Sequence, residues 1–143
     1  MWPHALLAAL ILGVPQNVTL GTQTCTVRVS SREQPERKRA SSVFSATEIV
    51  DLRFDVTFPT LAPGEHKLEL QVLTPRGHLY QSLVVPFVRG PAGRERFKQV
   101  TAPLPVAGTS IMTSSLYGRW RVVPYVDSLR TSCAAPQSFT LKR

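Results

Sequence analysis

Residues 52–58 read Leu-Arg-Phe-Asp-Val-Thr-Phe, and this stretch decides the fold. Its four apolar side chains alternate with arginine, aspartate and threonine. A period of two residues is that of a β-strand, in which successive side chains point to opposite faces of the sheet. The stretch therefore predicts a central strand with one buried face and one face in water.

Similar patterns lie on both sides of this stretch. Residues 25–30 alternate in the same way, and the turn at 59–65 leads to Leu68, Leu70 and Val72, which alternate with polar residues. The strands before and after that turn form either a hairpin or a pair that crosses between sheets. Weaker patterns predict further strands at residues 79–88, 97–104, 108–113, 117–122 and 138–142.

Pro86 and the polar segment 30–42 qualify this pattern. A proline cannot donate a hydrogen bond to a sheet, so Pro86 predicts an edge strand or a bulge. Residues 30–42 are polar and charged, and we expect them to form a loop between the first two strands.

The whole chain fits one all-β domain. It has 143 residues with 12 prolines and 8 glycines, which is the length of a single domain and a poor composition for helical bundles. About seven or eight short strands follow one another at near-regular spacing, without a helical period after residue 14. This is the pattern of a single antiparallel β-sandwich.

Three runs of residues resemble bacterial extracellular immunoglobulin-like modules. They are residues 73–81 (LTPRGHLYQ), residues 116–127 (LYGRWRVVPYVD) and the final Phe139-Thr140-Leu141. The resemblance covers residues 48–142 and implies an immunoglobulin-like β-sandwich. Pro124 departs from it, because a residue that joins the sheet is usual there. The polar residues 130–133 also lengthen the approach to the last strand, which leaves the register of the last hairpin open.

The first residues predict export. Residues 5–14 are apolar and uncharged over a length typical of a signal-peptide core and too short to span a bilayer. We predict a signal peptide at 1–21 and the domain at 22–143, in a secreted or periplasmic protein without a membrane span. The alternative is that the apolar run is a buried N-terminal strand or helix of the domain.

Cys25 and Cys133 stand near the two ends of the predicted domain. In an oxidising compartment they can form a disulfide that closes most of the chain into a loop. The alternative is two independent thiols, because separation in sequence does not fix separation in space. No spacing of cysteines or histidines predicts a metal site, and no cofactor is expected.

Few residues offer catalytic chemistry. Only His66 and His78 follow the predicted leader, both beside turns, where a solvated histidine is the ordinary expectation. Asp51 and Asp55 share a strand face, but Arg53 lies between them, which favours a solvated row of alternating charge. No nucleophile, phosphate-binding or metalloprotease motif is present. We expect a protein that is not an enzyme.

The charge suggests a second kind of partner. The sequence has 17 Lys and Arg against 9 Asp and Glu, a net charge of +8. The main hypothesis is a binding or structural module that engages a protein through loops or a sheet edge. The alternative is binding of a polyanion, such as an acidic polysaccharide, if the basic segments converge; ordinary solubilising charge also explains them. The residues concerned are Arg32, Arg37, Lys38, Arg39, Arg94, Arg96 and Lys98.

Overall fold

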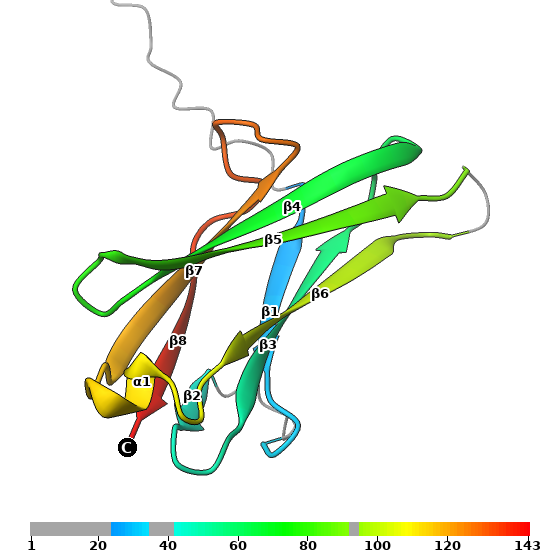
Figure 1. Ribbon diagram of the computed structural model, residues 1–143. Coiled ribbons are helices and arrows are strands. Elements are labelled where there is room, and N and C mark those ends of the chain that lie inside the picture. Colours follow the sequence, from blue (N-terminus) through cyan, green and yellow to red (C-terminus); the bar gives the residue numbers. More distant parts are fainter. Residues whose placement is uncertain (1–23, 35–41, 92–94) are drawn as a thin grey trace, which may run out of the picture.

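Two β-sheets pack face to face in the computed structural model, which describes residues 24–34, 42–91 and 95–143. Figure 1 shows the two layers, with the short helix α1 at one end. The predicted leader, residues 1–21, lies outside the described residues. The elements in chain order are β1 (Thr26–Ser30), β2 (Val43–Ser45), β3 (Asp51–Phe58), β4 (Gly64–Leu73), β5 (Leu79–Arg89), β6 (Lys98–Pro105), α1 (Ser110–Thr113), β7 (Gly118–Val126) and β8 (Gln137–Lys142).

The sheets have three and five strands, in the orders β1-β3-β6 and β2-β8-β7-β4-β5. All strand pairs are antiparallel except β2 with β8, which is parallel. The predicted all-β sandwich is confirmed. The turn after β3 carries the chain from the smaller sheet to the larger one, so the crossing alternative was right for β3 and β4.

The alternation read from the sequence places the core between the sheets. Leu52, Phe54, Val56 and Phe58 of β3 are buried, each at most 1% exposed. They face the buried residues of the other sheet, and the ring of Phe54 lies 5.6 Å from that of Phe139 on β8. Trp120, Val122, Leu68, Leu70, Val72 and Leu141 complete the opposite side of this core.

Two local predictions are corrected. Residues 108–113 do not form a strand, because Ser110–Thr113 is helical and buries Ile111 against the core. Residues 43–45 form β2, although the sequence predicted no strand there. This strand of three residues is too short to show an alternating pattern, and it exists because it pairs with the distant β8.

The two prolines that the sequence singled out, Pro86 and Pro124, lie in strands where a missing N–H is tolerated. Pro86 is on β5, an edge strand, as predicted. Pro124 is on β7, between β4 and β8, but β8 pairs only with residues 118–122 of β7. Beyond that point the loop takes the place of β8, and the N–H of Cys133 donates to the carbonyl of Pro124 at 3.0 Å. The long approach to β8 thus forms a fixed loop beside β7.

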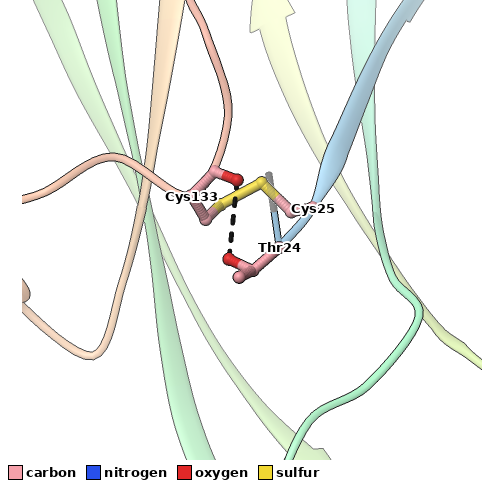
Figure 2. Close-up of a disulfide and its surroundings, with 3 residues drawn as sticks. All are labelled: Thr24, Cys25 and Cys133. Atoms are coloured by element: carbon pink, nitrogen blue, oxygen red, sulfur yellow. Dashed lines mark hydrogen bonds between the residues drawn. A yellow bond between two sulfur atoms is a disulfide. The ribbon is translucent and has the colours of Figure 1, made fainter. Parts of the chain in front are cut away.

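That loop is joined to the start of β1 by the disulfide Cys25–Cys133, which confirms the predicted pair. The bond closes a separation of 108 residues, and both cysteines are buried. The carbonyl of Cys133 accepts hydrogen bonds from the N–H groups of Thr24 and Cys25 at 2.8 and 3.1 Å. Figure 2 shows the hydroxyl of Thr24 directed to the same carbonyl.

The first two runs that carry the resemblance meet at Gly118. A Cβ atom there would lie 3.1 Å from the Cβ and Cγ atoms of Pro75, and Gly118 has a φ of +135°. Only glycine combines that backbone angle with such a close approach. The turn between β4 and β5 therefore packs on the start of β7.

Removal of the disulfide should lower the free energy of unfolding by about 2–5 kcal/mol, because the bond restricts the unfolded chain. Denaturant unfolding of the wild type with and without reductant measures this. The double variant Cys25→Ala/Cys133→Ala should show no response to reductant. An unchanged wild-type midpoint under reduction would contradict a stabilising bond.

Gly118→Ala should lower the free energy of unfolding by about 1–3 kcal/mol, because alanine strains the backbone at positive φ and its methyl group crowds Pro75. Gly90→Ala is the matched control, since no atom lies within 4 Å of a Cβ there. Thermal unfolding of both variants makes the comparison. Equal losses at the two positions would contradict the packing described for Gly118.

Candidate interaction surface

The outer side of the larger sheet carries exposed apolar residues on β5. Because Leu68 and Leu70 of β4 point inward, Lys67 and Glu69 point outward. The register places Val84 of β5 opposite Glu69, so Val84 shares the outer face. Val84 is 53% exposed and Val88, four residues further along β5, is 59% exposed.

Tyr125 of β7 extends this outer face on the other side of β4. It is opposite Glu69 in the register of β4 with β7 and is partly buried. Glu69 therefore lies between Val84 and Tyr125, in a row that runs across three strands. We call the following set the β4–β5 face: Lys67, Glu69, Val84, Val88 and Tyr125.

The outer side of the smaller sheet is polar in comparison. Arg53, Asp55 and Thr57 of β3 point outward there, and Asp55 accepts a hydrogen bond from the hydroxyl of Thr101 at 2.6 Å. None of the exposed large hydrophobic residues in the described part of the chain lies on β1, β3 or β6. The apolar outer surface is thus a property of the larger sheet.

The structure describes only three of the seven residues predicted to bind a polyanion, namely Arg32, Arg96 and Lys98. Arg37, Lys38, Arg39 and Arg94 lie outside the described residues. Arg32 follows β1, whose last residue, Ser30, is opposite Arg53. Lys98 begins β6 and is opposite Phe58, at the other end of β3. Arg32 therefore lies beyond one end of the smaller sheet, while Arg96 and Lys98 lie at the other end. Figure 1 shows the strands of this sheet, β1, β3 and β6.

The described residues after the β5–β6 turn form a shallow hollow of about 420 Å³, lined by residues 95–99. Phe97 is 54% exposed there, between Arg96 and Lys98. Arg89 does not add to this charge on the surface. It is buried, and its Nη2 donates to the carbonyl of Glu95 at 3.0 Å.

His66 is not the solvated turn residue that the sequence predicted. It lies on β4, which begins already at Gly64, and its side chain is only 10% exposed. Its Nδ1 is 2.6 Å from Oδ2 of Asp127, and its Nε2 is 2.6 Å from the carbonyl oxygen of Ala62. Its ring also stacks on Phe87. The sequence gives no signal for this pair, because 61 residues separate its members.

Both ring nitrogens of His66 face acceptors, so the protonated ring satisfies both contacts. The hydrogen bond to Asp127 and then the one to Ala62 raise the pKa of His66, against desolvation. For Asp127, desolvation acts upward, but hydrogen bonds from His66 and from the N–H of Lys67 leave its pKa lowered. The pair fastens the end of β7 to β4 and to the turn before it.

The other side chains considered as possible catalytic groups lie on the surface. His78 is exposed in the turn between β4 and β5, as predicted. Asp51 and Asp55 share the outer face of β3 with Arg53, also as predicted. Among the described residues, no group of three or more His, Cys, Asp or Glu could hold a metal ion. In the same part of the chain, no helix is long and apolar enough to span a bilayer.

Comparisons with known proteins do not assign a family. No family model matches the sequence, and no curated protein is similar to it. Among solved structures, a DNA glycosylase of Pseudomonas fluorescens is similar at TM-score 0.48 and 14% identity, over 87% of this chain and 32% of that one. A CARDB domain from Pyrococcus furiosus gives 0.40 and 13%, over 82% and 84%.

A β-glucosidase of Listeria innocua gives a TM-score of 0.44 and 14% identity, over 82% of this chain. The chain spans 16% of that enzyme and 32% of the glycosylase. At TM-scores below 0.5, these likenesses decide neither the fold nor the function. The β-sandwich rests on the two sheets themselves.

The His66 pair should make the protein less stable as pH rises through the folded-state pKa of His66. That pKa is raised, so the stabilisation is complete below the unfolded value of about 6.5 and is lost above the folded one. His66→Gln should remove this dependence and lower the free energy of unfolding near pH 6, where a hydrogen bond to a charged group is worth about 1.5–3 kcal/mol.

Unfolding midpoints between pH 5 and 9 measure the effect, and His78→Gln, at the exposed histidine, is the control that should leave it unchanged. The lowered pKa of Asp127 adds stability above the unfolded value of about 3.9, which is lost as pH falls through the folded value. A wild-type midpoint that does not fall in the alkaline range relative to His66→Gln would contradict the charged pair.

Proposed function

We propose that the protein is an exported, non-catalytic binding module of the immunoglobulin-like kind, which engages a protein partner through the β4–β5 face. The carrying observation is the pair Val84 and Val88, both more than half exposed on the outer side of β5. Pro86 lies between these two valines and is exposed as well, so the three side chains form one apolar row. A contiguous apolar surface is a common mark of a site of interaction with a partner. Apolar residues framed by charges are also usual in protein interfaces.

The face of the sheet is a better contact than the free edge of β5. Pro86 lies on that edge strand and has no N–H to offer to an added strand. Prolines on edge strands are a common protection against such pairing. The partner is therefore expected to cover side chains on the sheet and not to extend it.

A catalytic role has less support in the described residues. The two nitrogens of His66 are occupied by Asp127 and Ala62, and His78 is exposed in a turn. Export is supported by the apolar run at 5–14 and by the buried disulfide, because such bonds persist mainly in oxidising compartments.

Polyanion binding is the second proposed function. It is favoured by Arg96 and Lys98, which flank the exposed Phe97 in the hollow after the β5–β6 turn. Contacts of cations with a polyanion weaken steeply as salt increases. Binding through the β4–β5 face, with its valines and single charges of each sign, should depend much less on salt.

The proposal predicts contact with a protein at Val84. A photo-crosslinking amino acid in place of Val84, in cells that make the protein, should give a discrete protein adduct. The same group in place of Thr57, on the outer face of the smaller sheet, is the matched control and should give none. Val88→Glu should reduce the adduct at position 84 at least tenfold, because it puts a charge beside an apolar contact.

Equal adducts at positions 84 and 57, or none at 84, would contradict the proposed face. Binding of an acidic polysaccharide to the purified protein, and not the adduct at 84, tests the polyanion alternative. Binding that is lost steeply between low and moderate ionic strength would favour that alternative.

A further inference from the structure

We infer that the partner of the β4–β5 face is a second copy of this chain, bound about a twofold axis that passes between Lys67 and Glu69. This inference rests on the proposed function and names its partner. It starts from the order of charges along the outer side of β4.

Lys67 and Glu69 are neighbours on the outer face and have opposite charges. They are two residues apart on β4, which is about 6–7 Å in a strand. No ion pair joins them in the described part of the chain. The charge of Lys67 also acts on Asp127 of its own copy, whereas no cation of the described residues pairs with Glu69. An outside partner with the reverse order would give Glu69 a cation and Lys67 a second anion.

A second copy turned by a twofold axis supplies that reverse order. The axis lies between the larger sheets of the two copies and is perpendicular to their strands. The β4 strand of the second copy then runs antiparallel above the β4 strand of the first. Lys67 of each copy then lies over Glu69 of the other, which makes two reciprocal ion pairs. Such a contact uses the same surface on both copies, as is usual in closed dimers.

The same rotation brings apolar residues of β5 together. Val84 is beside Glu69 and Pro86 is beside Lys67 in the register of β4 with β5. Val84 of one copy therefore lies over Pro86 of the other. Val88 and Ser82, beside Glu65 and Gln71, meet in the same way. The apolar contact excludes water from the two ion pairs, which strengthens their attraction.

The smaller sheet has a similar charge order, but a threonine stands where the larger sheet has Val84. Arg53 and Asp55 are also two residues apart on an outer face, but Asp55 is already bonded to Thr101. The residues beside them on β6 are Pro103 and Thr101. This sheet therefore provides a matched control for changes of charge.

Sedimentation velocity of the purified mature protein over a range of concentrations tests the inference. The wild type should associate to a dimer as concentration rises. Lys67→Glu and Glu69→Lys should each weaken the dimer at least tenfold, because each places like charges in both reciprocal contacts. The double variant Lys67→Glu/Glu69→Lys should recover most of the affinity, since it restores both pairs with reversed sign.

Two controls separate loss of the contact from loss of the fold. Arg53→Glu and Asp55→Lys should leave the dimer unchanged, and all variants should keep a cooperative thermal transition. Val84→Glu should abolish the dimer in a folded protein. Recovery in the double variant supports the twofold contact, because a merely unfolded single variant would not be rescued by a second change of charge.

A wild type that stays monomeric at every concentration would overturn the inference, as would single variants that dimerise like the wild type. The adduct at position 84 distinguishes this failure from failure of the proposed function. An adduct with twice the mass of the chain supports the second copy. An adduct with a different protein, together with a monomeric wild type, overturns the second copy and leaves the proposed function in place.

Discussion

Inward side chains from both sheets meet in one core, and their burial fixes the register of the strands that bear them. Phe54 of the smaller sheet lies against Phe139 of the larger one, and Trp120 stacks near Phe139 at 6.1 Å. A shift of the strand register by one residue would expose a whole row of apolar side chains to water. The outer residues are held by the same constraint, so the β4–β5 face exists because Leu68 and Leu70 are buried beneath it.

A second set of contacts holds the loop between β7 and β8 against the sandwich. The loop before β8 supplies Cys133, which bonds to Cys25 and also donates to Pro124. Nearby in sequence, Asp127 at the end of β7 holds His66 of β4. Covalent, backbone and charged contacts thus fasten the stretch after Pro124 to both sheets. The proline and the polar stretch that departed from the family pattern are part of this arrangement.

The fold was predictable where burial on one side gives a strand its period of two. The alternation at residues 52–58 and at Leu68, Leu70 and Val72 matched buried rows of β3 and β4. The predicted strand at residues 108–113 was wrong, because a helix of one turn is too short for its own period to appear in the sequence. Strand β2 was not predicted, because it is defined by pairing with a strand nearly a hundred residues later.

For the candidate site, the sequence by itself determined which residues were available but not which of them lie next to one another in space. It predicted an all-β chain, an edge strand or a bulge at Pro86, polar residues such as Lys67 and Glu69 opposite the apolar row of Leu68, Leu70 and Val72, and two cysteines able to pair. Only the tertiary structure placed Val84 and Tyr125 on either side of Glu69 and brought His66 to Asp127. The physical reason is the sequence separation of the interacting residues. Alternation depends on residues next to each other in the chain, while the neighbours of a strand depend on how the whole chain buries its apolar faces.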